Sequence, residues 1–271
     1  MRLGIGSYAF AWAIGVPDYL PDAPLSHQGL LKKGRMLGAD CIQFGDNLPL
    51  HALSQEARTA LKAQADAGGI GIEVGARGLW PEQVMDYLEI ADFFESPILR
   101  LVVDGPDYEP TPEEIIRIIR DLLPEFRQRN IRLAIENHDR LKARTFVEII
   151  EKTDSEWVGI CLDSVNSLGA DEGFGEVARL LLPHTINLHV KDYRIQRQRH
   201  KMGFIVSGTP AGKGMLPIPE LIAQLQDLGK CQSAILELWP PLDHNVEATI
   251  KKEEQWARES MAYLRNILPH G

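Results

Sequence analysis

Short apolar runs and longer amphipathic segments alternate along the whole chain. Eight of the runs have the length and composition of buried strands, and after each of them the apolar spacing changes to the repeat typical of helices. The predicted strands are Arg2 to Tyr8, Asp40 to Phe44, Ile70 to Gly75, Ile98 to Val103, Arg132 to Glu136, Val158 to Leu162, Thr185 to Val190 and Ser233 to Leu238. The predicted helices lie near residues 26–37, 54–67, 81–94, 111–130, 142–152, 175–182, 217–228 and 246–268.

A strand followed by a helix, eight times over, is the order of a (β/α)8 TIM barrel, an α/β fold with its active site at the C-terminal ends of the strands. An open doubly wound sheet is the alternative. It more often has a glycine-rich dinucleotide turn after its first strand, and Gly4-Ile5-Gly6-Ser7 lacks the rest of that motif. No linker or shift in composition divides the sequence, so we expect one barrel domain over residues 1–271.

Within the predicted strands, large apolar side chains alternate with small or polar ones. In the fifth strand Leu133 and Ile135 would face the helices, and the other parity would face the barrel interior. Glu73 and Arg100 fall on inward positions of neighbouring strands and are expected to pair there. Four further inward positions lie at the ends of the last four strands: Glu136, Asp163, His189 and Glu237. In a barrel they should converge at one mouth.

Composition narrows the functional classes. Apolar content of 44% and charged content of 25% are ordinary for a globular protein, and no apolar run is long enough to span a membrane. Met1-Arg2 leads straight into a strand rather than a signal peptide, which predicts a cytoplasmic protein. A net charge of −9 argues against a general nucleic-acid binder. The three cysteines are widely separated and suggest neither a disulfide framework nor a thiolate metal site.

The convergence of three carboxylates and one imidazole predicts a metal site. Bare carboxylates in a shared site repel one another, and a divalent cation removes that cost. Any one of the four residues taken alone could be an ordinary hydrogen-bonded structural group. Together, three oxygen ligands and one nitrogen ligand suit one Mn²⁺, Mg²⁺ or Co²⁺ ion better than a thiolate-type zinc site, with Zn²⁺ kept as an alternative.

These residues and their surroundings resemble the xylose isomerase-like TIM barrels. The resemblance rests on ENH at 136–138, the strand-end Asp163, LHVKD at 188–192, a Gly-x-Gly at 212–214 and LEL at 236–238. That superfamily includes sugar isomerases and epimerases, inosose-processing enzymes, hydroxypyruvate isomerase and endonuclease IV. The resemblance implies that the four strand-end residues are the metal ligands. It also implies that Glu136 and Glu237 exchange protons with a ketose through an enediolate.

At two places the sequence departs from the pattern of particular subgroups of this superfamily. The keto-sugar 3-epimerases usually have a histidine and an arginine where this chain has Asn166 and Ile195. The early strands also lack the histidines of a three-metal repair nuclease, so we expect no nucleic-acid substrate.

Substrate contacts are predicted around the mouth. The candidates are His138, Asn166, Lys191, Arg194, Trp12 and Trp239. The basic segment 191–213 has no clear structural pattern; it is either a solvated surface or a lid that favours an anionic substrate such as a sugar acid.

The sequence therefore predicts a divalent-metal-dependent isomerase or epimerase of a small keto-sugar or polyol ketone. A metal-dependent decarboxylase of a 3-oxo sugar acid, of the 3-oxo-isoapionate type, would use the same ligands and is the first alternative. A non-catalytic sugar-binding module is the second. The expected partner is a small sugar or sugar acid, with no membrane, and the last helix offers a contact for a homo-oligomer.

Overall fold

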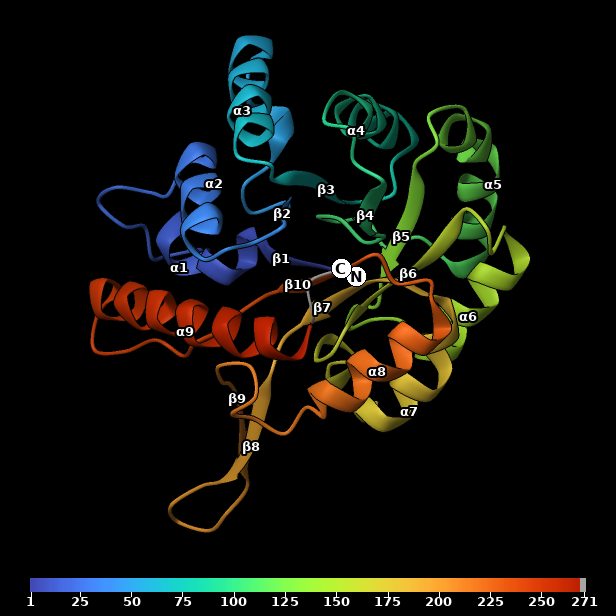
Figure 1. Cartoon of the computed structure of the whole chain (residues 1–271). Coiled ribbons are helices and arrows are strands. Elements are labelled where there is room, and N and C mark those ends of the chain that lie inside the picture. Colours follow the sequence, from blue (N-terminus) through green and yellow to red (C-terminus); the bar gives the residue numbers. More distant parts are fainter. Residues whose placement is uncertain (269–271) are drawn as a thin grey trace.

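Eight parallel strands close into a barrel in the computed structural model, which describes residues 1–268. Around the barrel the strands follow the order β1-β10-β7-β6-β5-β4-β3-β2. Their bounds are β1 Arg2–Gly6, β2 Cys41–Phe44, β3 Gly71–Arg77, β4 Ile98–Val102, β5 Arg132–Glu136, β6 Val158–Asp163, β7 Thr185–Val190 and β10 Ser233–Leu236. Figure 1 shows this barrel at the centre with the helices arranged outside it. The predicted TIM-barrel fold is confirmed.

Helices cover the outside of the barrel, and α5 begins with a capping motif that is recognisable in the sequence. They are α1 Ala11–Ile14, α2 His27–Met36, α3 Gln55–Ala67, α4 Pro81–Phe93, α5 Pro112–Gln128, α6 Ala143–Lys152, α7 Phe174–Leu181, α8 Ile218–Leu228 and α9 Val246–Ile267. At the start of α5, Thr111 Oγ1 accepts from the Glu114 N–H at 3.3 Å and the Glu114 carboxylate accepts from the Thr111 N–H at 2.8 Å. No helix in residues 1–268 combines the length and apolarity needed to cross a membrane.

The barrel interior carries a polar layer below the mouth. Glu73 there accepts hydrogen bonds from Arg2 at 2.9 Å and from Gln43 at 3.1 Å. The expected pair between Glu73 and Arg100 is therefore wrong. The cause is strand register: Arg100 lies beside Gly75 across the β3–β4 ladder, so Glu73 sits one inward position lower than Arg100. The Arg100 guanidinium faces the mouth instead.

Two strand ends differ from prediction in ways that affect the mouth. β3 continues past Gly75 to Arg77, which adds one more inward position to that strand. β10 ends at Leu236, two residues early, yet the Glu237 N–H still donates to the Val190 carbonyl at 3.1 Å. Glu237 therefore keeps its place beside the end of β7.

The segment after β7, for which no structure was predicted, folds into an antiparallel hairpin. Its strands are β8 Tyr193–Arg197 and β9 Phe204–Gly208, paired from Tyr193 opposite Gly208 to Arg197 opposite Phe204. Figure 1 shows the hairpin projecting away from the barrel, beyond α8 and α9. The expectation of an irregular segment was wrong, because two strand-forming stretches flank a turn at Gly203, which has a φ of 85°.

Candidate metal centre

The four predicted ligands meet at the mouth of the barrel. His189 Nδ1 lies 3.3 Å from Glu136 Oε2, 3.3 Å from Glu237 Oε1 and 3.9 Å from Asp163 Oδ2. All four side chains are buried. Each sits at or next to the end of an adjacent strand, from β5 through β6 and β7 to β10, which is why residues about a hundred positions apart converge.

The orientation of the His189 ring is fixed from below. Its Nε2 lies 2.7 Å from Gln43 Oε1. The Gln43 amide nitrogen donates to Glu73 and Asn187, both at 3.1 Å, so its oxygen must be the atom that faces the imidazole. His189 therefore donates from Nε2 and presents the lone pair of Nδ1 to the carboxylates, as a neutral metal-binding histidine does.

The atoms of this cluster suit a divalent cation. Within residues 1–268, His189 Nδ1 is a buried nitrogen with no hydrogen-bond partner. Single ligand atoms of Asp163, His189 and Glu237 all lie within 4.8 Å of one another. Buried polar atoms are nearly always satisfied, so an unpartnered imidazole nitrogen surrounded by carboxylate oxygens fits a site built for a metal.

Lys191 contributes a positive charge to the same cluster. Its Nζ lies 2.7 Å from Asp163 Oδ2 and 2.9 Å from Glu237 Oε2. Burial alone would lower the pKa of Lys191, but the two carboxylates outweigh burial and raise it. Burial likewise opposes the ionisation of Glu237, yet neighbouring positive charges, the Lys191 ammonium among them, lower its pKa. Both groups are therefore charged across the physiological pH range.

Glu136 is held differently from Glu237. Its Oε2 accepts from Arg100 Nε, and its Oε1 accepts from Asn166 Nδ2 at 2.8 Å. Arg100 is itself buried, with 3% of its surface exposed. The predicted substrate residue Asn166 thus contacts a proposed metal ligand directly.

A chain of charges that was not predicted continues from Arg100 along the rim. Asp46, just after β2, accepts from Arg77 Nε at 2.9 Å and lies 3.4 Å from Arg100 Nη1. The Tyr8 hydroxyl donates to the same Asp46 carboxylate at 3.2 Å. On its far side, Arg77 Nη2 lies 3.3 Å from His138 Nε2. The inward parity of Glu73 and Arg77 could have identified Arg77, had β3 been predicted to run two residues further.

The remaining predicted substrate residues lie at varying distances from the cluster. His138 contacts Arg77 at the rim rather than any of the four ligands. The indoles of Trp12 and Trp239 donate to the carbonyls of Pro240 and Asp192, at 3.0 Å and 3.3 Å. Arg194 lies on the exposed hairpin, where its guanidinium donates to the Lys213 carbonyl at 2.6 Å. The structure does not bring Arg194 to the cluster, so its substrate contact stays a prediction.

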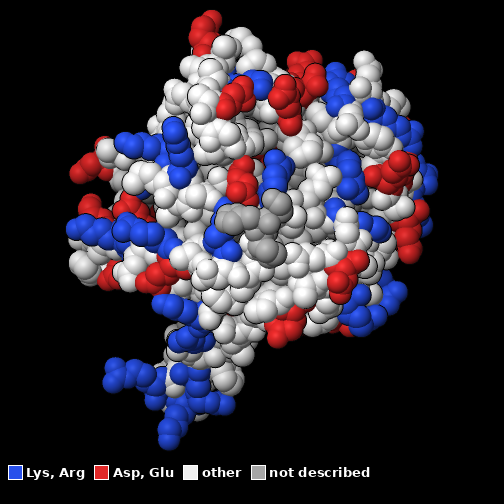
Figure 2. Space-filling model, viewed as in Figure 1, with Lys and Arg blue, Asp and Glu red and all other residues white. Residues whose placement is uncertain are grey.

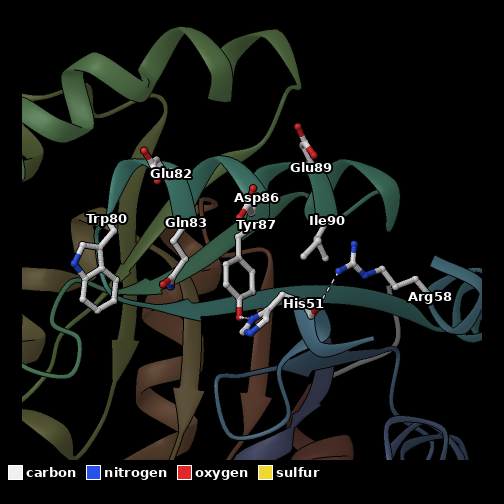
Figure 3. A pocket seen from close by; sticks show the side chains of 9 residues that line it. All are labelled: His51, Arg58, Trp80, Glu82, Gln83, Asp86, Tyr87, Glu89 and Ile90. Carbon is white, nitrogen blue, oxygen red and sulfur yellow. Dashed lines mark hydrogen bonds between the residues drawn. The ribbon is translucent and has the colours of Figure 1, made fainter. Parts of the chain in front are cut away.

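A groove of about 700 Å³ on the outside of the barrel contains none of these residues. Figure 3 shows its lining, where the Tyr87 hydroxyl lies 2.6 Å from His51 Nδ1 and Arg58 donates to the His51 carbonyl. The remaining lining residues are Trp80, Glu82, Gln83, Asp86, Glu89 and Ile90. The groove is separate from the metal-type cluster.

Comparison with known proteins agrees with this geometry. The family profile described as "Xylose isomerase-like TIM barrel" matches residues 31–267. The chain belongs to this family. The resemblance inferred from the strand-end motifs is thereby confirmed.

Individual relatives differ in what they do. A 3-oxo-isoapionate decarboxylase from Pectobacterium atrosepticum is 32% identical over 272 residues, covering 100% of this chain and 97% of that protein. A solved D-psicose 3-epimerase from Clostridium cellulolyticum H10 is 16% identical, with a TM-score of 0.74 and full coverage of both chains. A xylose isomerase-like barrel from Mycobacterium smegmatis, solved with magnesium, is 18% identical, with a TM-score of 0.68 and 97% coverage of each chain. The two structures establish the shared fold.

Proposed function

We propose that this chain is a divalent-metal-dependent decarboxylase of a 3-oxo sugar acid. The full-length similarity to a 3-oxo-isoapionate decarboxylase supports this reaction over the epimerisation that the motifs alone favoured. The observation within the site that carries the proposal is the unequal environment of its two glutamates.

A two-base epimerase needs both carboxylates to take up and return a proton. Both oxygens of Glu136 already accept hydrogen bonds, one from Arg100 and one from Asn166, so about two of its four lone-pair sites are taken before a metal or substrate binds. Glu237 lies instead beside the ammonium of Lys191, which can donate a proton. A site with one clamped carboxylate suits a reaction that needs proton delivery from one side only, as decarboxylation does.

The metal ligands in this proposal are Glu136, Asp163, His189 and Glu237. A divalent ion bound there supplies Lewis-acid polarisation of substrate oxygens. The predominance of oxygen ligands favours Mn²⁺, with Mg²⁺, Co²⁺ and Zn²⁺ as alternatives. Gln43 holds the His189 ring in the binding orientation, and Arg100 and Asn166 hold Glu136.

The reaction breaks the bond between the carboxylate carbon and its neighbour. The electron pair of that bond passes to the adjacent ketone as an enolate, CO₂ leaves, and the former α-carbon then takes a proton. Lys191 holds a proton at Nζ, 2.9 Å from Glu237 and 2.7 Å from Asp163. We assign the delivery of that proton to Lys191 and the alignment of its ammonium to Glu237.

Recognition of the sugar acid falls to the rim. The Arg77 side chain is 30% exposed, and its contacts to Asp46 and His138 use Nε and Nη2, so further N–H donors remain to face a substrate carboxylate. Trp12 and Trp239 would wall the carbon chain of the substrate, as aromatic side chains commonly do in sugar sites. This assignment gives anion selectivity to Arg77 at the mouth rather than to the projecting hairpin.

Isomerisation or epimerisation of a keto-sugar is the second candidate. It is favoured by the equal 3.3 Å separations of Glu136 and Glu237 from His189, which allow the two carboxylates to flank one substrate.

One pair of assays separates the two reactions. The metal-loaded protein is given a 3-oxo sugar acid while CO₂ is measured, and separately a neutral ketose in D₂O while deuterium uptake is followed. The proposal predicts CO₂ release with one solvent proton in the product and slow exchange into the ketose. Exchange without carbon loss would establish the isomerase, and binding without turnover would establish a sugar-binding module.

A further inference from the structure

The β8–β9 hairpin is a two-stranded ribbon with no other strand beside it in residues 1–268. Figures 1 and 2 show it protruding from the body of the molecule. Isolated two-stranded ribbons are marginal in water and usually need a surface to pack on. Within residues 1–268 the contacts of the hairpin with the rest of the chain lie toward its base, where Arg194 donates to the Lys213 carbonyl and the Ile195 N–H to Met215 Sδ, and its outer part is exposed.

One face of the ribbon is apolar and exposed. The register pairs Ile195 with Val206 and Arg197 with Phe204, and alternation puts all four side chains on the same face. Ile195 is 40% exposed, Val206 43% and Phe204 58%. The guanidinium of Arg197 lies 4.5 Å from the centre of the Phe204 ring. Ile205, which is 53% exposed, lies on the opposite face.

The base of the hairpin is fixed to the barrel. The Asp192 carboxylate at its base accepts four backbone N–H groups, from Tyr193, Gly212, Gly214 and Leu216. The strand ends pack against the mouth at Gly208, where an added Cβ would lie 2.5 Å from the Trp239 carbonyl oxygen. An arm whose base is held in place loses less conformational entropy on binding than a free segment does.

The charge of the hairpin is opposite to that of the rest of the chain. Residues 193–214 contain Arg194, Arg197, Arg199, Lys201 and Lys213 and no acidic residue. With −9 for the whole chain and +5 for this segment, the remainder carries −14. Figure 2 shows the basic side chains covering the protruding end. The neighbouring helix α8 exposes Glu220 and Asp227 and has no lysine or arginine.

We propose that the hairpin is a dimerisation arm that lays its Ile195, Val206 and Phe204 face on the acidic body of a second copy of this chain. Homo-oligomers most often have two-fold symmetry, in which each subunit gives and receives the same contact. Here each basic arm would meet an acidic body, so the two contacts are complementary in charge and each covers an exposed apolar face. The proposal does not depend on which reaction the barrel catalyses.

The test is sedimentation equilibrium of the full-length chain. Wild type should sediment at twice the 30.3 kDa chain mass. I195T/V206T keeps β-branched residues on the ribbon but makes two of the three apolar residues of its contact face polar, and should weaken dimerisation roughly tenfold or more. I205T makes the same kind of change on the opposite face and should leave dimerisation within about twofold.

A charge-reversal pair tests the electrostatic part independently of ribbon stability. R197E/R199E should dissociate the dimer, whereas K32E/R35E, the same charge change on exposed positions of α2, should not. Wild-type dimerisation should also weaken as NaCl rises from about 0.05 M to about 0.5 M. A monomeric wild type, equal weakening by I205T and I195T/V206T, or a monomer that binds anionic vesicles or nucleic acid through the arm would overturn the proposal.

Discussion

The interior hydrogen bond between Gln43 and His189 offers a sharp test of the metal centre, because it can be removed without touching any proposed ligand. Gln43→Met keeps the side-chain length and removes the oxygen that lies 2.7 Å from His189 Nε2. The imidazole then loses the partner that fixes its tautomer and its ring orientation. Nδ1 would no longer be held as the free lone pair among the carboxylates.

The expected loss of metal affinity follows from the position of this hydrogen bond, which holds the ring nitrogen of His189 opposite the one that would bind the metal. Removing a partner of a metal-binding histidine typically weakens metal affinity tenfold to a hundredfold, which is about 1.4 to 2.8 kcal/mol. The metal-free protein should also lose stability, because Glu73 and Asn187 each lose a donor that now lies at 3.1 Å. An unsatisfied buried polar group costs about 1–3 kcal/mol.

Titration of Mn²⁺ by calorimetry measures the first effect, and urea unfolding of the metal-free protein measures the second. Ser233→Ala is the matched control, since it removes the 2.8 Å partner of Asn187 in the same polar layer but leaves the His189 contact intact. Ser233→Ala should lower stability without a comparable loss of Mn²⁺ affinity. The reasoning is refuted if Gln43→Met binds Mn²⁺ as wild type does, or if both variants weaken binding equally.

Three further predictions concern the reaction and the stability of the barrel. Glu237→Gln should lower kcat about 10²- to 10⁴-fold while circular dichroism stays unchanged, and wild-type turnover by this variant would remove Glu237 from the mechanism. Arg77→Gln should raise the KM for the oxo acid roughly tenfold, because a charged hydrogen bond is lost, and leave the affinity for a neutral ketose nearly unchanged; equal effects on both ligands would argue against a carboxylate contact. Burial raises the pKa of Glu253 to about 8, above its unfolded value of 4.5. The free energy of unfolding should therefore fall as the pH rises from about 4.5 to about 8, and urea unfolding at several pH values measures this fall. Glu253→Gln should not show it.

The barrel and its four strand-end residues could be predicted because both depend on local pattern. Eight apolar runs gave the strands, and a period of two within each run separated Glu136, Asp163, His189 and Glu237 from the side chains that face the helices. Parity within a strand is a local property of the chain. The convergence of four strand ends then follows from closure of the barrel.

Contacts that depend on the register between neighbouring strands could not be predicted from the pattern within each strand. Glu73 and Arg100 were expected to pair because their strands are neighbours, but Arg100 lies beside Gly75. The clamp of Arg100 on Glu136 and its contact with Asp46 follow from that offset, which no single strand encodes.

The β8–β9 hairpin was not predicted because its sequence is rich in arginine and lysine. Arg194, Arg197 and Arg199 suggested a solvated loop. They made the strand pattern hard to recognise, in which Tyr193 pairs with Gly208, Ile195 with Val206 and Arg197 with Phe204. A strand that exposes apolar residues commonly packs on a surface outside its own domain. The sequence of one chain does not identify that surface, so the strand could not be predicted from it.

The most direct test of the central claim is the metal content of the purified chain by mass spectrometry, measured together with CO₂ release from a 3-oxo sugar acid. We expect one divalent ion per chain, loss of the ion and of CO₂ release on chelation, and recovery of both on adding Mn²⁺. Asp163→Asn should purify folded, with the metal and the activity both lost. A metal-free wild-type protein whose decarboxylation is insensitive to chelators would contradict the account.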